Sequence, residues 1–114
     1  MNDDEAYHNF TYKLVAMGIL AILIHEREIP AQQIQFIFIQ LAMGLNNYHR
    51  AKKAFGSLKP ENILVFKCFK APHGPLVYKL DKVMAGRGDG TIADDLRDLG
   101  MIYHWLHMIG RQDS

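Results

Sequence analysis

An uncharged apolar run of eleven residues, from Leu14 to Ile24, constrains the fold of this chain more than any other feature. A helix that crosses a lipid bilayer needs about 20 apolar residues, so the run is too short to span a membrane. Acidic residues at positions 3–5 precede the run, whereas a signal peptide carries positive charge there. The run therefore predicts a segment buried inside a protein that does not associate with a membrane.

We expect this run to be the second half of one helix from about Asp4 to Glu28. That half is apolar on every side, so it must be covered on every side. A chain of 114 residues forms one domain, 1–114, which is small for this task. The alternatives are a central core helix and a helix shared between two copies of a homodimer. For the homodimer we predict a self-interface at Leu20, Leu23 and Ile24.

The middle of the chain has mixed periodicity. Residues 30–54 place apolar side chains on a wide helical face, although the β-branched and aromatic stretch Ile34–Gln40 also suits a strand. Good helix formers continue without a turn signal before Gly44, which favours a helix. Residues 60–70 and 76–85 are predicted as two further helices. The alternative for these two segments is a β-hairpin over residues 63–80.

The last helix has the clearest signals. Thr91 and Asp94 have the spacing of a capping box, in which the two side chains satisfy the free N–H groups at a helix start. Apolar residues then recur at helical spacing, and the helix is predicted to end near Gly110. These elements together predict an all-α fold, a compact bundle of about five helices that forms a dimer. The alternative architecture is α+β with the hairpin at 63–80.

No motif in the sequence predicts catalysis. The stretch Leu58–Leu64 has the spacing of a protein-kinase catalytic loop, but Ser57 stands where the catalytic Asp is required. The glycine-rich stretch 86–91 lacks the spacing of a phosphate-binding loop. His104 and His107 are one turn apart without further metal ligands, and Cys68 among aromatic residues is typical of a buried, inert thiol. We therefore predict that the protein is not an enzyme and has no cofactor or metal site.

Charge is distributed unevenly along the chain. Residues 49–87 contain nine basic and two acidic residues, whereas residues 1–28 and 88–114 each have a net charge of −3. A basic segment is typical of a surface that contacts phosphates, so a nucleic-acid-binding transcriptional regulator that uses residues 49–70 is the alternative function. Its predicted contacts are Arg50, Lys52 and Lys53.

The apolar excess in a short chain without site chemistry favours a different function. We predict a small regulatory protein that binds another protein and inhibits or modulates it, as an antiactivator, inhibitor or adaptor does. Aromatic side chains dominate the energetics of protein interfaces. The predicted partner-binding residues are Phe36, Phe38, Tyr103, Trp105 and Ile109. The single cysteine is typical of a reducing compartment, which predicts a cytoplasmic protein.

Overall fold

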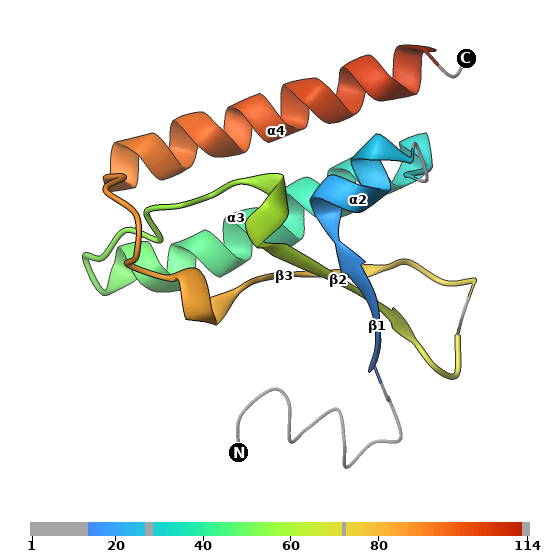
Figure 1. Ribbon diagram of the computed structural model, residues 1–114, viewed down its shortest axis with the longest axis horizontal. Coiled ribbons are helices and arrows are strands. Elements are labelled where there is room, and N and C mark those ends of the chain that lie inside the picture. The colour runs from blue at the N-terminus through green and yellow to red at the C-terminus, as the bar shows by residue number, and fades with distance from the viewer. Residues whose placement is uncertain (1–13, 27–28, 72, 113–114) are drawn as a thin grey trace.

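The computed structural model of the chain is an α+β fold and describes residues 14–26, 29–71 and 73–112 (Figure 1). In chain order, its strands and helices are β1 (Leu14–Ile19), α2 (Leu20–His25), α3 (Ile34–Arg50), β2 (Ile63–Cys68), β3 (Val77–Leu80) and α4 (Ile92–Gln112). Short 3-10 turns are η1 (Ala31–Gln33), η2 (Pro60–Asn62) and η3 (Lys82–Met84). The prediction of an all-α bundle of about five helices is therefore wrong.

The apolar run at the start of the described chain is a strand followed by a short helix. Ile19 still has an extended backbone, with φ −110° and ψ 155°, and α2 begins at the next residue. The pairing of β1 with β2 shifts between Ala16 and Gly18, and Gly18 has a φ of 127°. Glycine tolerates this conformation, which makes the β-bulge possible. The prediction of one helix over residues 4–28 is therefore wrong for Leu14–Ile19, which form β1, and right for the six residues of α2; positions 4–13 and 27–28 lie outside the described residues.

The segments predicted as helices over 60–70 and 76–85 are mainly the two strands of a hairpin. β2 pairs with both β1 and β3 in antiparallel fashion, and Val65 lies opposite Tyr78. Side chains alternate along these strands, so that Ile63, Val65, Tyr78 and Leu80 are buried while their neighbours are partly exposed. This period of two is what a strand with one buried face requires. The hairpin over 63–80, which the sequence left open, is present.

The predictions of helices in 30–54 and at the end of the chain are confirmed by α3 and α4. The capping box also forms, because the Thr91 N–H donates to Asp94 at 2.8 Å and the Asp94 N–H donates to the Thr91 hydroxyl at 3.2 Å. The Thr91 N–H and the Thr91 hydroxyl, the latter at 3.1 Å, both donate to the Asp94 carboxylate, and together with the charge of Arg97 they hold the pKa of Asp94 below its usual value. Helix α4 therefore begins as the sequence predicts.

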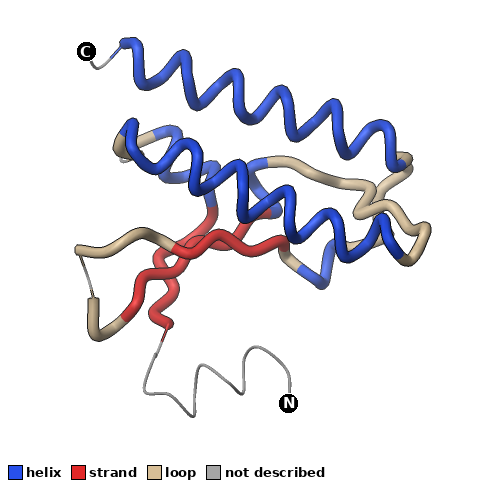
Figure 2. Tube along the Cα trace, turned by 180° about the vertical axis from the view of Figure 1, so that it is seen from behind, coloured by secondary structure: helices blue, strands red, loops and turns tan. Residues whose placement is uncertain are grey.

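Helix α3 lies between the sheet and α4. It lies against β3, the edge strand of the sheet, and Figure 2 shows the helix beside the strands from behind. Its buried residues Ile34, Ile37, Leu41 and Leu45 share one core with the sheet and α4. The axes of α3 and α4 run antiparallel, because the start of α4 contacts the end of α3 and Tyr103 contacts Phe38.

The molecule is thin, with dimensions of 42 × 37 × 18 Å. The sheet and α2 lie toward the viewer in Figure 1, and α3 lies behind them. Within the described part of the chain, no helix is both long and apolar enough to cross a membrane.

Candidate functional site

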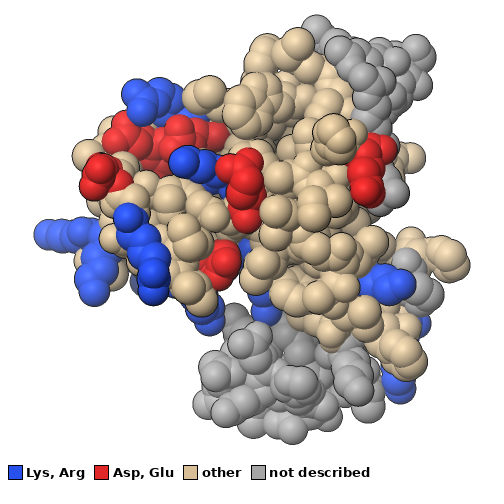
Figure 3. Space-filling view, viewed as in Figure 1, with Lys and Arg blue, Asp and Glu red and all other residues tan. Residues whose placement is uncertain are grey.

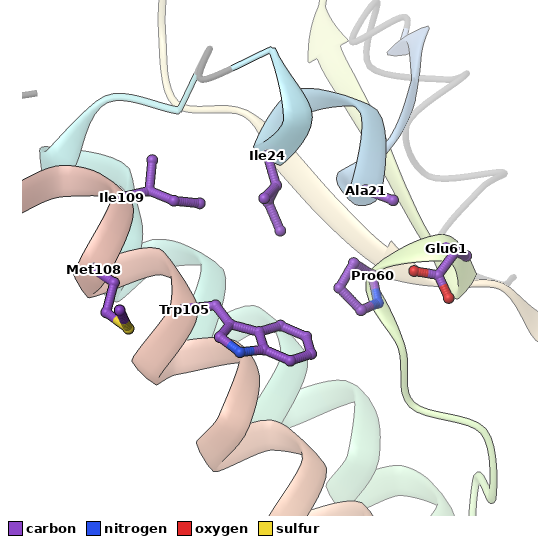
Figure 4. Close-up of a pocket in the computed structure, with 7 residues that line it drawn as sticks. All are labelled: Ala21, Ile24, Pro60, Glu61, Trp105, Met108 and Ile109. Atoms are coloured by element: carbon purple, nitrogen blue, oxygen red, sulfur yellow. The ribbon is translucent and has the colours of Figure 1, made fainter. Parts of the chain in front are cut away.

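An apolar groove separates α4 from α2 and the η2 turn. One hollow of the groove has a volume of about 400 Å³ and is lined by Ala21, Ile24, Pro60, Glu61, Trp105, Met108 and Ile109. A second hollow of about 290 Å³ shares Pro60, Glu61 and Trp105 and extends to Asp98 and Met101. In Figure 4 the indole of Trp105 projects from α4 toward Pro60, and Ile24 and Ile109 face each other. We call this site the Trp105 groove.

Helix α4 supplies one wall because its two apolar stripes have different neighbours. Leu99, Ile102 and Leu106 are buried in the core. Met101, Trp105 and Met108 recur at i, i+4 and i+7 and stay 46, 42 and 46% exposed. This spacing places the three side chains on one side of a helix. Helix α4 thus keeps a half-exposed apolar stripe after its packing with α3 is complete.

The opposite wall is fixed by the chain before β2. Pro60 is buried at the start of the η2 turn, and the side-chain amide of Asn62 donates to the Ser57 carbonyl at 2.7 Å. The Ser57 hydroxyl in turn donates to the Met84 carbonyl at 3.0 Å. The kinase-like stretch Leu58–Leu64 therefore forms a structural turn, and Ser57 and Asn62 have structural roles in it.

The charged residues that line the groove are Glu61, Asp98 and Lys59. Glu61 lines both hollows, whereas Lys59 and Asp98 line only the second one. Acidic groups therefore outnumber basic ones at the groove. An acidic rim favours a ligand that carries positive charge beside its apolar groups.

The structure separates the predicted partner-binding residues into different places. Trp105 and Ile109 both line the Trp105 groove. Phe38 packs edge-to-face on Tyr103 with ring centroids 5.0 Å apart, so this pair joins α3 to α4. Phe36 is exposed elsewhere on α3.

The predicted self-interface residues also have different environments. Leu20 and Leu23 are buried in the core of the single chain, where α2 meets the sheet and η2. Ile24 is partly buried and lines the groove. Leu20 and Leu23 thus present almost no surface to a second copy, and self-association through α2 stays a prediction that would depend on Ile24.

A second apolar area lies on the outward side of α3. Phe36, Ile39 and Met43 are 47, 51 and 65% exposed and have the spacing i, i+3, i+7. Gln35, Asn46 and Asn47 are exposed on the same helix. We call these six residues the α3 surface. The sequence placed Phe36 at a partner interface but did not single out Ile39.

The basic segment 49–70 is divided between distant places. Arg50, Lys52 and Lys53 are exposed where α3 ends, whereas Lys67 and Lys70 lie at the far end of β2 and beyond it. Figure 3 shows basic side chains at the end of the molecule where α4 begins and near the tip of the hairpin, with acidic side chains interleaved at the first place. The segment does not form one basic patch on this face.

Asp95 is the center of a polar junction that the sequence did not reveal. Its side chain is fully buried at the start of α4. One carboxylate oxygen accepts from the Phe55 N–H at 2.7 Å and lies 2.8 Å from His49 Nε2, and the other accepts from the Gly56 N–H at 2.9 Å. These partners are 39 to 46 positions away in sequence. We call Asp95 and its three partners the Asp95 junction.

The glycine-rich stretch 86–91 packs against this junction. A Cβ atom on Gly88 would lie 2.3 Å from the Gly56 carbonyl oxygen, and one on Gly90 would lie 2.7 Å from it. The Gly90 N–H also donates to the Gly56 carbonyl at 3.2 Å. These glycines allow two backbone segments to touch, so their role in the structure is close packing.

The remaining titratable candidates do not assemble into a site. Among the described residues, no group of three or more His, Cys, Asp or Glu could hold a metal ion. His104 is exposed, His107 packs edge-to-face against Tyr103 with ring centroids 4.4 Å apart, and Cys68 is a partly buried free thiol. Burial raises the pKa of Tyr78 to about 12, and no described residue accepts or donates a hydrogen bond at its hydroxyl.

Comparisons of the chain with protein-family models, with curated proteins and with solved structures found no match.

Proposed function

We propose that this protein is a non-enzymatic regulator that binds another protein, as an antiactivator, inhibitor or adaptor does. The observation that carries the proposal is the half-exposed Trp105 in the groove, next to Pro60 and Met108. Tryptophan and methionine are enriched in protein interfaces, and a concave apolar site of this size accepts several side chains of a partner. The free thiol of Cys68 supports a cytoplasmic location.

The chemistry of the groove specifies the partner segment. Apolar positions along α4 at i, i+4 and i+7 are typical of a site that accepts the apolar face of a second helix. Glu61 and Asp98 favour basic residues at the edge of that face. We therefore propose a basic amphipathic helix of another protein as the ligand.

The experiment is a fluorescence titration, because Trp105 is the single tryptophan of the chain. The probes are two synthetic helical peptides without tryptophan, which have the same leucine face and carry either lysine or glutamate on the other face. We expect the lysine peptide to shift the Trp105 emission to shorter wavelength with micromolar affinity. We expect the glutamate peptide to bind at least tenfold more weakly.

Two variants on α2 control this titration. Ala21 lines the groove, so Ala21→Glu should weaken binding of the lysine peptide at least tenfold. Ile22 is exposed on the same helix but does not line the groove, so Ile22→Glu should bind like the wild type. Equal binding of both peptides, or equal loss in both variants, would contradict the proposal.

Nucleic-acid binding is the second candidate, and it is supported by the exposure of Arg50, Lys52 and Lys53 at one end of α3. This function requires an affinity that falls steeply with salt concentration. Fluorescence anisotropy with labelled DNA and RNA should then detect binding that is lost when both Lys52 and Lys53 are replaced by alanine. Unchanged anisotropy with both nucleic acids at low salt would rule it out.

A further inference from the structure

We infer that two copies of this chain associate through the α3 surface, with the two α3 helices antiparallel around a two-fold axis near Ile39. The inference concerns a different face from the Trp105 groove and does not depend on the proposed function. It relies on the exposure of the α3 surface, on its lack of charge and on the symmetry of its apolar residues.

The exposed side of α3 is unusual for a helix face in water. An amphipathic helix of a monomer normally carries charged residues on its outward side. Here no Asp, Glu, Lys or Arg occurs between residues 29 and 48. The outward side carries Phe36, Ile39 and Met43 instead, at least 47% of each is exposed, and charge begins on this side only at Arg50, the last residue of the helix. Loss of charge together with gain of Phe and Met is typical of the center of a protein interface.

The neutrality of the face favours a second copy as its occupant. A charged face would repel an identical face, and it would select a foreign partner of opposite charge. The α3 surface has neither property, since its polar members are the amides Gln35, Asn46 and Asn47. An amide both donates and accepts hydrogen bonds, so it can pair with another copy of itself. The surface is therefore compatible with itself.

The order of the apolar residues fixes the geometry. In a two-fold interface, a residue i that contacts j is matched by a residue j that contacts i. Ile39 is near the middle of the stripe, with Phe36 on one side and Met43 on the other. Antiparallel pairing around Ile39 places Phe36 of each copy against Met43 of the other. This arrangement buries the complete stripe of both copies and keeps the like ends of the two helix dipoles apart, whereas parallel pairing would place those like ends side by side.

The size of the face sets the expected affinity. Helix α3 has 17 residues, and at 1.5 Å rise per residue it is about 25 Å long. One helix face of this length is smaller than the roughly 800 Å² per partner that a stable interface buries. We therefore expect a reversible dimer that forms in the micromolar range.

The test is the molar mass of the full chain, measured by sedimentation velocity across a hundredfold range of concentration. We expect the wild type to change from monomer to dimer in that range. Phe36→Lys and Met43→Glu should each shift the dissociation constant upward at least tenfold, because each places an unpaired charge in the interface. The double variant should dimerise again, since the introduced lysine of each copy would then lie opposite the introduced glutamate of the other.

A matched control separates this face from the groove. Met108→Glu makes the same chemical change on a methionine of the groove, so the dimer should persist in that variant. Circular dichroism melts of each variant show that the fold is retained. A wild type that remains monomeric over the whole range would overturn the inference, as would a dimer that Met108→Glu disrupts and Met43→Glu does not.

Disulfide trapping tests the antiparallel geometry without an added charge. In a Cys68→Ser background, Ile39→Cys places a thiol near the axis, where the Cα atoms of two packed helices approach to within disulfide range. We expect copper-phenanthroline oxidation to trap the Ile39→Cys dimer at low micromolar concentration. Phe36→Cys alone should be trapped at least tenfold more slowly. Faster trapping through position 36 than through position 39 would overturn the antiparallel arrangement.

Discussion

The Asp95 junction and the Trp105 groove lie on the same helix, yet the chain treats them in opposite ways. At the junction, both oxygens of a buried carboxylate have partners from the chain itself. At the groove, about three turns further along α4, a tryptophan is left 42% exposed beside a hollow of about 400 Å³. The first region holds α4 against the end of α3, and the second has apolar surface to offer a partner.

This contrast shows how a thin molecule divides its two tasks. A buried charge without partners is severely unfavourable, so the junction has to be complete within the chain. Half-exposed apolar side chains cost much less, so they can remain open until a partner arrives. We therefore expect substitutions at the junction to change stability, and substitutions at the groove to change binding.

The largest expected effect is at the junction itself. Asp95→Ala leaves the N–H groups of Phe55 and Gly56 and the ring of His49 without their acceptor. We expect the free energy of unfolding to fall by about 3 kcal/mol, because buried groups that lose a partner keep their desolvation cost. Urea denaturation measures the change.

Asp98 provides the matched control for this comparison. It lies one turn further along α4 and is only partly exposed at the groove rim. Asp98→Ala should change stability by less than about 0.5 kcal/mol, as surface substitutions usually do. If both alanine variants lost equal stability, the claim that the Asp95 junction contributes more to stability than the groove rim would be wrong.

The edge of β3 is the next most sensitive place. The side-chain amide of Gln40 donates to the Leu76 carbonyl at 3.2 Å and accepts from the Tyr78 N–H at 3.0 Å, so it pairs with the backbone of β3 as a neighbouring strand would. Gln40→Ala should lower the free energy of unfolding by about 2 kcal/mol, since two hydrogen bonds are lost. It should also speed aggregation, because open strand edges recruit other chains.

Thermal melts and light scattering measure these two effects. Gln32→Ala is the control, because Gln32 is exposed in η1 just before the same helix. That variant should melt and scatter like the wild type. Loss of stability without faster aggregation in Gln40→Ala would mean that the amide supports packing but does not protect the edge.

Two of the predicted helices, α3 and α4, are the part of the fold that the sequence predicted well. Both α3 and α4 have long periodic apolar faces, and the Thr91–Asp94 capping box lies within four residues. Such signals are local, so one segment contains all of the information. The sequence did not predict the strands with the same success, because their apolar runs are short. Their stability comes from partners that are distant in sequence, such as Tyr78 opposite Val65. In residues 76–84 an apparent helical stripe concealed the alternation that buries Tyr78 and Leu80.

The candidate sites follow the same rule. The sequence singled out Trp105 and Ile109 as partner-binding residues, and both line the groove. The sequence did not predict the groove itself, because Ala21 and Ile24 reach Trp105 only through the fold. Asp95 was equally hidden, since the sequence shows it only as one of several acids at a helix start while its partners lie 39 or more residues away.

Tyr78 differs from the Asp95 junction, where the buried polar groups have partners within the chain. Its buried hydroxyl has no hydrogen-bond partner among the described residues. Its pKa is about 12 in the folded state, above the ordinary value of 10.0. The folded protein thus holds this proton more tightly than the unfolded chain, and stability falls as pH rises from 10 toward 12. We expect the wild type to lose about 1 kcal/mol more than Tyr78→Phe between pH 9 and pH 11.

Urea denaturation at the two pH values measures this difference. At pH 7, Tyr78→Phe should be as stable as the wild type or slightly more stable, since it removes an unsatisfied polar group. A clear loss of stability at pH 7 would indicate that the hydroxyl has a partner after all. Equal losses of the two proteins at alkaline pH would place its titration elsewhere.

The smallest expected effect is a gain in stability next to the junction. Lys52 has a φ of 59° at the end of α3, where its N–H donates to the His49 carbonyl and the Lys53 N–H donates to the Tyr48 carbonyl. This pattern is the helix ending that normally uses glycine, because side chains disfavour that backbone conformation. Lys52→Gly should raise the free energy of unfolding by about 0.5 kcal/mol, after the entropy cost of glycine is subtracted.

Lys53→Gly removes the same charge at a residue with negative φ, so it should lower stability instead. If both variants changed stability equally, the lost charge rather than the backbone conformation of Lys52 would be the cause.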